Sequence, residues 1–193
     1  MAARQTAPPT PARTLTNALN PFFIFTALYA LVALARCTLP EALLYVALEL
    51  IAAGTVAGYV LLMRRRSRVS DFWISTRAQR LVPSLFLLGA FIGLLAALAL
   101  LDGPKALLLT TLSMGLAATT VAAITLVWKA SAHCAVAGHA AAAGPLLLGP
   151  TGLIFTLALP LVLYARISPG AHTVLQALAG AGVGAAFAFV FLT

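Results

Sequence analysis

Charged residues are scarce in this chain, and acidic residues are the scarcest. Its 193 residues include 12 Lys and Arg but only 4 Asp and Glu, whereas 62% are of apolar types. A soluble domain usually carries about 25% charged residues, but the share here is 8%. So few charges cannot cover a water-facing surface, and we therefore expect the lipid bilayer to be the solvent of this protein. The composition excludes a secreted disulfide scaffold, a disordered tail and an ordinary cytosolic enzyme.

The shortage of acids and cysteines also limits the chemistry. The sequence has no Asp-rich cluster for magnesium, which argues against a prenyltransferase of the DDxxD kind, and it has no Walker loop, CxxC pair or HExxH motif. Cys37 and Cys134 lie far apart, and we interpret them as free thiols in apolar surroundings. We therefore expect no metal site and no cofactor. The four acids are Glu41, Glu49, Asp71 and Asp102.

Long apolar runs predict an all-α, polytopic bundle of transmembrane helices. Each run approaches the ~20 residues needed to cross the hydrocarbon, and none alternates as the strands of an outer-membrane barrel do. We interpret the first run as a retained helix rather than a signal peptide. Breaks near Gly144-Pro145 and Gly149-Pro150 leave the count at six or seven spans. The spans are expected at about 18–36, 41–63, 81–101, 105–128, 131–148, 150–166 and 171–192.

Basic residues lie unevenly on the two sides of this predicted bundle. With seven spans, Arg36 and Lys105 fall on one side and ten basic residues on the other, which predicts a cytoplasmic active-site face in a bacterial cell membrane. The net charge of +8 is then explained by topology and by contact with phosphate or anionic headgroups, and we expect no nucleic-acid partner. Residues 1–17 predict a disordered cytoplasmic head, and residues 18–193 a single transmembrane catalytic domain. The ten are Arg4, Arg13, Arg64, Arg65, Arg66, Arg68, Arg77, Arg80, Lys129 and Arg166.

Three polar clusters lie at span ends on the more basic side. They supply three arginines, a lysine, a serine and two histidines with almost no acids, a ratio that indicates an anion-binding site. Ser131 opens the predicted helix 131–148, so its hydroxyl and the free backbone N–H groups beside it could bind the anion too. One histidine could attack phosphorus while the other protonates the leaving oxygen. The clusters are Ser70–Arg80, Trp128–His133 and Arg166–His172.

These segments resemble motifs of the phosphatidic acid phosphatase type 2 superfamily of membrane lipid phosphatases. The third motif of that family, SRxxxxxHxxxD, is similar to the segment that holds Arg166, His172 and Gln176 at matching positions. The second motif, PSGH, is similar to Ala130–His133, and the first, KxxxxxxRP, is matched loosely by Arg77–Arg80. The chain is more similar to a divergent bacterial and archaeal branch with an SD…R..R segment and a WKxSxH segment.

The resemblance covers about residues 64–185 and implies roles for the matching residues. His172 would be the nucleophile and His133 the general acid. Trp73 stands where the first motif has its lysine, and Arg77 or Lys129 could replace that charge. Gln176 stands in place of the Asp that orients the nucleophile, and a neutral amide stabilises an imidazolium less well than a carboxylate does, so weaker catalysis is expected. The residues expected to bind phosphate are Arg77, Arg80, Lys129, Ser131 and Arg166, with Gln176 and Asp71 in support.

We therefore expect a metal-independent membrane lipid phosphatase that forms a phosphohistidine intermediate. Its substrate would be a lipid phosphate or diphosphate of the isoprenyl or the phosphatidate type. An alternative is a catalytically weak or inactive lipid-binding or scaffold protein on the same fold, which the two departures from the family motifs motivate. A third alternative is a transporter or channel subunit, but the two halves show no convincing inverted repeat.

Several other residues have simpler interpretations. His139 has no motif partner, so we expect it to pack or bond between helices. Asp71 is expected to pair with a neighbouring arginine, and Arg64–Arg68 to serve as a topology signal or headgroup contact. Glu49, in the middle of a span, is either bonded inside the bundle or protonated. Close helix packing is expected at the Gly- and Ala-rich stretches 135–144 and 178–186.

Overall fold

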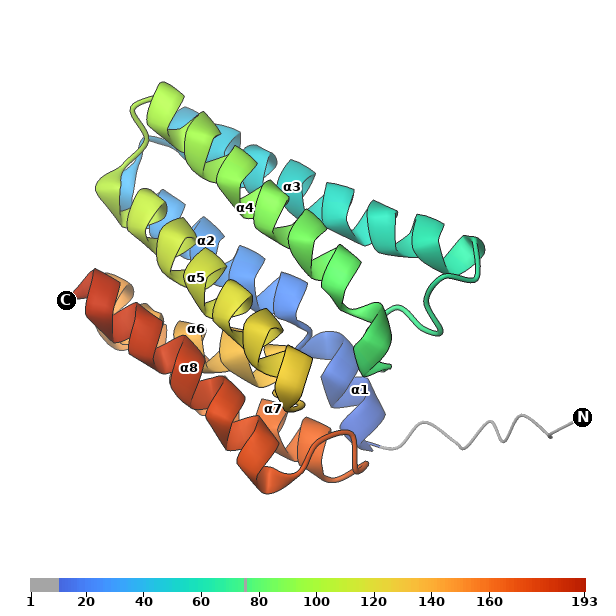
Figure 1. Cartoon of the computed structure of the whole chain (residues 1–193). Helices are drawn as coiled ribbons and strands as arrows, with labels where there is room; N and C mark the ends of the chain where they lie inside the picture. Colours follow the sequence, from blue (N-terminus) through green and yellow to red (C-terminus); the bar gives the residue numbers. More distant parts are fainter. Residues whose placement is uncertain (1–10, 75) are drawn as a thin grey trace, which may run out of the picture.

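The described part of the chain is all-helical, as expected from the sequence. A computed structural model describes residues 11–74 and 76–193, and it contains no strand there (Figure 1). Two short 3-10 turns lie at Arg77–Gln79 and Gly149–Gly152. The helices are α1 (Pro11–Ala18), α2 (Pro21–Arg36), α3 (Leu39–Arg65), α4 (Leu81–Leu100), α5 (Lys105–Val127), α6 (Ala132–Leu148), α7 (Leu153–Ile167) and α8 (Val174–Leu192).

Five stretches of the described residues are long and apolar enough to cross a membrane. They are α3, α4, α5, α8 and the segment Ala132–Ile167, which contains both α6 and α7. The apolar side chains of α3 and α4 point outward, as Ile51 (63% exposed) and Leu85 (59% exposed) illustrate, and such a surface suits lipid rather than water. The predicted class, a helical membrane bundle, agrees with these findings. The count of six or seven spans stays a prediction. Helix α2, with 16 residues, is shorter than the five stretches, and α6 and α7 together form only one of them.

The predicted disordered head is wrong for residues 11–17. These residues form most of α1, which packs against α7 through a hydrogen bond of 3.3 Å from the Thr16 hydroxyl to the Ala165 carbonyl. Ala12 is buried in the same contact region. A Pro- and Thr-rich composition disfavours a helix in isolation, but tertiary packing stabilises this one, with Pro11 in the first turn where proline is tolerated. Residues 1–10 of the predicted head lie outside the described residues.

Polar caps and prolines fix where helices begin. Asn20 precedes α2, and its side-chain oxygen accepts a hydrogen bond of 3.1 Å from the Phe23 N–H. Thr38 and Glu41 form a capping box at α3, in which the Thr38 N–H donates to the Glu41 carboxylate at 2.9 Å. Each cap satisfies backbone N–H groups that the first turn of a helix leaves unpaired. The caps of α6 and α8 lie at the candidate site and are described below.

Helices α6 and α8 pack at backbone contact, as the Gly- and Ala-rich stretches predict. A Cβ atom on Gly184 would overlap the carbonyl of Ala135, and one on Gly180 would overlap the carbonyl of Ser131. Small residues allow helices to approach this closely. The start of α6 is thereby held rigidly against the first half of α8.

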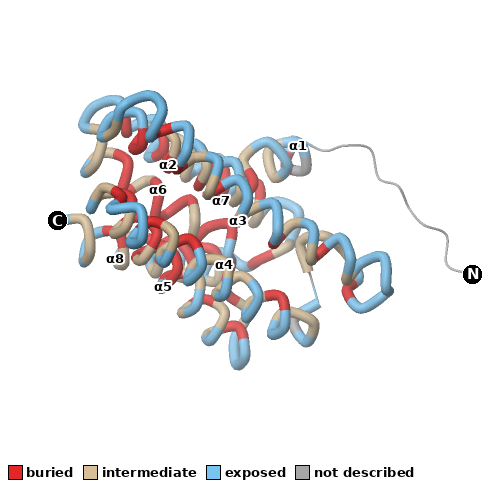
Figure 2. The backbone as a smooth tube through the Cα atoms, turned by 90° about the horizontal axis from the view of Figure 1, so that it is seen from above, coloured by how far each residue is buried: buried red, intermediate tan, exposed pale blue. Residues whose placement is uncertain are grey.

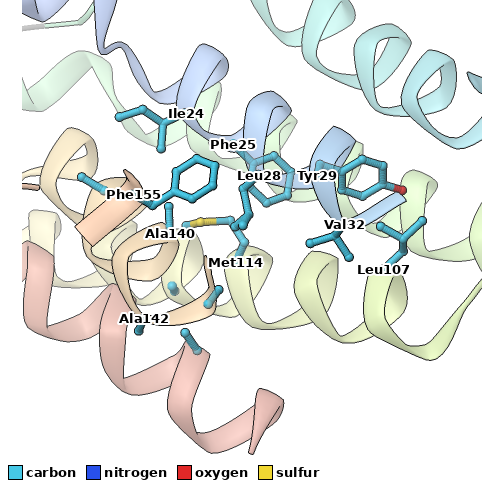
Figure 3. Packing of buried hydrophobic residues seen from close by; sticks show 14 of the residues in the cluster. Ile24, Phe25, Leu28, Tyr29, Val32, Leu107, Met114, Ala140, Ala142 and Phe155 are labelled. Atoms are coloured by element: carbon cyan, nitrogen blue, oxygen red, sulfur yellow. The ribbon is translucent and has the colours of Figure 1, made fainter. Parts of the chain in front are cut away.

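A cluster of buried apolar residues lies between α2, α5 and α6. Figure 2 shows the buried turns in the interior of the bundle and the exposed turns around its outside. Figure 3 shows the side chains of Phe25, Leu28 and Met114 gathered between these helices. Helices α6 and α7 fold back on each other at the turn Gly149–Gly152. The Thr156 hydroxyl on α7 donates to the Ala141 carbonyl on α6 at 2.9 Å.

The antiparallel course of the helices divides the basic residues between two ends of the bundle. Arg36 and Lys105 lie at the end where α2 stops and α5 starts, and Arg36 donates to the Leu147 carbonyl there. The opposite end, called the basic end, holds the starts of α2, α4, α6 and α8. Arg4 and the side chains of Arg13 and Arg77 lie outside the described residues. The described members of the basic end are Arg64, Arg65, Arg66, Arg68, Arg80, Lys129 and Arg166.

Candidate active site

Both candidate catalytic histidines line one cavity at the basic end. His133 stands in the first turn of α6, and His172 lies in the segment just before α8; each is buried. The cavity has a volume of about 250 Å³, and Arg80 and Arg166 also line it. Four residues from three separate sequence clusters therefore line one cavity.

Three buried polar atoms of these lining residues have no hydrogen-bond partner among the described residues. They are Nε2 of His133, Nε of Arg166 and Nδ1 of His172. Buried polar groups in proteins are nearly always paired, so a cluster of three unsatisfied ones indicates a place for a polar ligand or water. The unsatisfied Arg166 nitrogen is a donor, and a ring nitrogen of histidine can donate or accept according to its tautomer.

The two arginines enter from different directions. Arg80 stands immediately before α4, and its Nε donates to the Ile74 carbonyl at 2.8 Å, which fixes the guanidinium relative to the preceding loop. Arg166 lies in the last turn of α7, and its carbonyl accepts a hydrogen bond of 3.0 Å from the His172 N–H. The same residue that supplies a guanidinium thus also positions the backbone of His172.

Burial and neighbouring cations keep His172 uncharged. Removal from water is the largest effect, followed by the charges of Arg166, Lys129 and Arg80, and together they lower the pKa of the imidazole to about 4. The Gln176 side chain opposes this shift by hydrogen bonding, but its effect is the smallest. At neutral pH the His172 ring therefore has a free lone pair, which a nucleophile requires.

Lys129 acts on the segment that carries His172. Its ammonium donates a hydrogen bond of 2.8 Å to the Ala171 carbonyl. Partial burial, then the charges of Arg80 and Arg166, lower the pKa of this lysine. Lys129 does not appear among the residues that line the cavity in the described part of the chain. The observed contact positions the neighbour of His172, and the predicted contact of Lys129 with phosphate stays a prediction.

Ser131 and Gln176 cap helices, and their predicted roles at the phosphate and beside His172 stay predictions. The fully buried Ser131 hydroxyl accepts from the Cys134 N–H at 3.4 Å, and Ser131 is not among the described lining residues. The side-chain oxygen of Gln176 accepts from the Thr173 N–H at 3.1 Å, while the Thr173 hydroxyl accepts from the Gln176 N–H at 3.3 Å. Both side chains satisfy backbone donors at helix starts, where such polar residues are most stabilising. The Thr-x-x-Gln spacing in the sequence is typical of such a capping box.

The loop before α4 places Asp71 near the arginines. Its carboxylate accepts from the Trp73 N–H at 2.9 Å and from the Ser70 hydroxyl at 3.1 Å. Burial lowers the pKa of Arg80, and the Asp71 charge opposes that shift. The carboxylate therefore shapes the loop and stabilises the Arg80 cation. The side chain of Arg77, the other arginine predicted here, lies outside the described residues.

An aromatic cluster that sequence reasoning missed covers His133. The Trp73 ring meets the His133 ring edge to face at a centroid distance of 4.7 Å. Phe72 contacts Trp73 at 4.8 Å, and Phe22, at the start of α2, lies 6.5 Å from Trp73. All three aromatic residues line the cavity. They provide an apolar cover for the imidazole on the side of the loop.

The cavity becomes apolar away from the basic end. Its walls there come from α3, α4 and α5, with Val56, Leu87 and Met114 as representatives. A second hollow, of about 420 Å³, lies between α4 and α5 and shares Arg80 and Ser84 with the first. The whole arrangement joins a cationic, imidazole-bearing head to an apolar body, a shape that suits an amphiphile with an anionic headgroup.

Two further buried ionisable residues, His139 and Glu49, are bonded within the bundle. Nε2 of His139 lies 2.8 Å from the Ser113 hydroxyl across α5 and α6, so the prediction of an interhelical bond is confirmed. Both carboxylate oxygens of Glu49 accept from the Thr26 hydroxyl at 3.0 Å. Glu49 also lines the cavity, whereas His139 does not appear among its described lining residues.

Comparison of the chain with family models gives no match, and neither the curated proteins nor the solved structures that were searched match it.

Proposed function

We propose that this protein is a metal-independent membrane lipid phosphatase of the kind found in the phosphatidic acid phosphatase type 2 superfamily, whose motifs it resembles. The observation that carries the proposal is the set of three buried nitrogens without partners, on His133, Arg166 and His172, around one cavity. A phosphate group would satisfy the arginine donor and lie beside both imidazoles. The substrate is a lipid phosphate or diphosphate whose chain occupies the apolar part of the cavity.

Arg80 and Arg166 supply the electrostatic part of the mechanism. Guanidinium groups pair with phosphate oxygens through two parallel hydrogen bonds and stay charged when partly buried. Fixed cations in a water-poor cavity stabilise the negative charge on the equatorial oxygens of the transition state. The hydrogen bond of Arg80 to the Ile74 carbonyl supports this role, because it holds the cation in place before substrate binds.

The two histidines divide the chemical steps. A ring nitrogen of neutral His172 attacks phosphorus, and the new N–P bond forms as the P–O bond to the lipid breaks. His133, in its imidazolium form, gives its extra proton to the leaving oxygen and becomes neutral, so that the lipid alcohol, or the lipid monophosphate from a diphosphate, departs. Water then attacks the phosphohistidine while His133 takes a proton from it. The N–P bond breaks, inorganic phosphate leaves and both histidines return to their starting states.

Phosphate release from lipid phosphates tests this proposal. The full chain is placed in nanodiscs with a metal chelator, and wild type is compared with His172→Ala. We expect His172→Ala to abolish release and His133→Ala to lower it by roughly 10²- to 10⁴-fold. Arg64→Ala is the matched control, because Arg64 is an exposed cation of the basic end outside the described cavity lining. Full turnover by well-folded His172→Ala would contradict the proposal.

A second candidate function is lipid phosphate binding without catalysis. One observation favours it: the Gln176 oxygen is bound to the Thr173 N–H, so the position that a carboxylate holds in the related motif serves here as a helix cap. Without that carboxylate, the imidazolium formed during catalysis is stabilised less well. Saturable binding of lipid phosphates with no release of phosphate from any of them would favour this candidate over the phosphatase.

A further inference from the structure

The apolar part of the cavity is a chamber with a closed floor. Its deepest lining residues are Glu49 on α3, Leu94 on α4 and Met114 on α5. Along α4, the path from Arg80 to Leu94 corresponds to roughly 20 Å at the rise of an α-helix. One turn beyond Leu94, the side chain of Leu98 is fully buried in the core. A chain that enters from the basic end therefore meets packed protein rather than an exit at the far side.

The volume of the chamber matches one chain rather than two. An apolar cavity of about 150 Å³ in another protein takes one benzene ring, so space of this size scales to roughly ten carbon atoms here. The cavity volume is about 250 Å³, and part of it lies between the arginines and histidines. A lipid with two long acyl chains would have to place the second one outside this chamber, in the adjoining hollow between α4 and α5 or in the bilayer.

The floor carries a polar group in otherwise apolar surroundings. Glu49 is 3% exposed, and the Thr26 hydroxyl donates to both of its carboxylate oxygens. A longer chain that pressed its methyl end against this carboxyl group would cover a polar group without replacing a hydrogen bond, which is unfavourable. Because Glu49 itself lines the chamber, the end of a long chain would meet its side chain directly. Both the size and the polarity of Glu49 therefore oppose binding of a longer chain.

We infer that the chamber takes at most about ten carbon atoms of one lipid chain, and that Glu49 sets this limit. The inference rests on the proposed function for the identity of the headgroup. The limit applies most simply to single-chain lipids, such as alkyl or short isoprenyl phosphates, whose one chain occupies the chamber.

A series of single-chain alkyl phosphates from about six to about eighteen carbon atoms tests the length limit, because it brackets the roughly ten carbons that the cavity volume allows. With wild-type protein in nanodiscs, kcat/KM should rise by up to about fourfold per added CH₂ and then level off near ten carbons. Glu49→Ala should carry the rise on to longer chains. Ala118→Phe, which adds bulk to the chamber wall four residues from Met114, should end it earlier. Leu116→Phe is the matched control on the outer face of α5 and should leave the wild-type profile.

The outcomes separate this inference from the proposed function. A Glu49→Ala profile equal to that of wild type, or a wild-type profile that keeps rising well beyond ten carbons, would overturn the inference and leave the phosphatase intact. If no compound releases phosphate, the phosphatase proposal fails, and the same length series is read as binding, by competition with a fluorescent alkyl phosphate. A binding profile that levels off near ten carbons and lengthens in Glu49→Ala then supports the chamber, and a flat profile overturns it.

Discussion

His172 owes its proposed role to its neighbours as much as to its own chemistry. An exposed histidine is partly protonated near neutral pH, but burial and the cations Arg166, Lys129 and Arg80 lower its pKa to about 4. The same cations would attract a phosphate. One set of charges therefore does two things, because it binds the anion and keeps the nucleophile unprotonated.

The pH dependence of kcat/KM tests this coupling. kcat/KM reports groups of the free enzyme, so the loss of activity due to His172 should occur only as the pH falls through about 4. Lys129→Gln removes one of the cations that lower the pKa of His172. In this variant the pKa of His172 should be higher, so activity should be lost at a higher pH than in wild type. Lys129→Arg should restore the wild-type profile. Ionisation of the substrate is common to all three proteins and cancels in the comparison; identical acid limbs in wild type and Lys129→Gln would be evidence against the coupling.

Helices α6 and α8 form the most closely packed pair around the site. Gly184 meets the Ala135 carbonyl and the His139 backbone nitrogen, so the register of α6 on α8 is fixed by contacts that leave no room for a side chain. This pair sets the distance between His133, at the start of α6, and His172, just before α8. The precision of the site therefore depends on glycines that lie outside it.

Gly184→Ala should destabilise the protein although alanine is the better helix former. The added methyl group overlaps the backbone of α6, and overpacking of this kind costs about 1–3 kcal/mol. For a chain of this size that corresponds to a fall of roughly 3–10 °C in Tm. Gly182→Ala is the matched control, because a Cβ atom there meets nothing within 4 Å. Thermal unfolding in nanodiscs measures both; equal Tm values for the two variants would argue against backbone contact between α6 and α8.

Helix positions follow closely from the apolar pattern, but helix caps and α1 do not. The runs expected at 81–101 and 105–128 correspond to α4 and α5 within a residue, because the breaks between them contain Gly and Pro. Helix α1 depends on its contact with α7, which no local pattern contains. Gln176 was assigned to the chemistry although Thr173-x-x-Gln176 is a capping-box signature. The side chain of Gln176 caps α8 and also acts on the pKa of His172 by hydrogen bonding, so the capping signal adds to the predicted supporting role and does not replace it.

At the scale of the whole molecule, the fold sorts basic residues to one end. Successive helices run in opposite directions, so Arg80, Lys129 and Arg166 share an end with the Arg64–Arg68 run, while Lys105 lies at the other. In membrane proteins such an asymmetry orients the chain with its basic loops in the cytoplasm. The active-site face is therefore predicted to be cytoplasmic.

Cysteine labelling in intact cells tests this orientation. Ser67→Cys at the basic end and Lys105→Cys at the other are introduced separately, with Cys37 and Cys134 replaced by serine. A membrane-impermeant maleimide should label Lys105→Cys from outside and should reach Ser67→Cys only after the cells are permeabilised. The reverse pattern would place the active site at the outer leaflet.

The meeting of distant residues is only partly predictable from sequence. Alternation of helices is enough to place His133, Arg166 and His172 at one end, and the structure brings all three to one cavity. The aromatic cover of His133 was not foreseen, because Phe22 and Trp73 are far apart in the chain and meet through the loop before α4. That loop includes Ile74 with a φ of 49°, a conformation that sequence does not predict for a β-branched residue.

Trapping of the covalent intermediate tests the central claim most directly. The full chain in nanodiscs is mixed with a lipid phosphate, quenched in alkali to preserve a phosphorus–nitrogen bond, digested and analysed by mass spectrometry. We predict a phosphoryl group on His172 in wild type and none in His172→Ala. If His133→Ala still reacts with decyl phosphate, the phosphoryl group should accumulate on His172 in that variant. Phosphate release by wild type with the phosphoryl group on another residue, or with no phosphorylated residue at any time during turnover, would contradict the account.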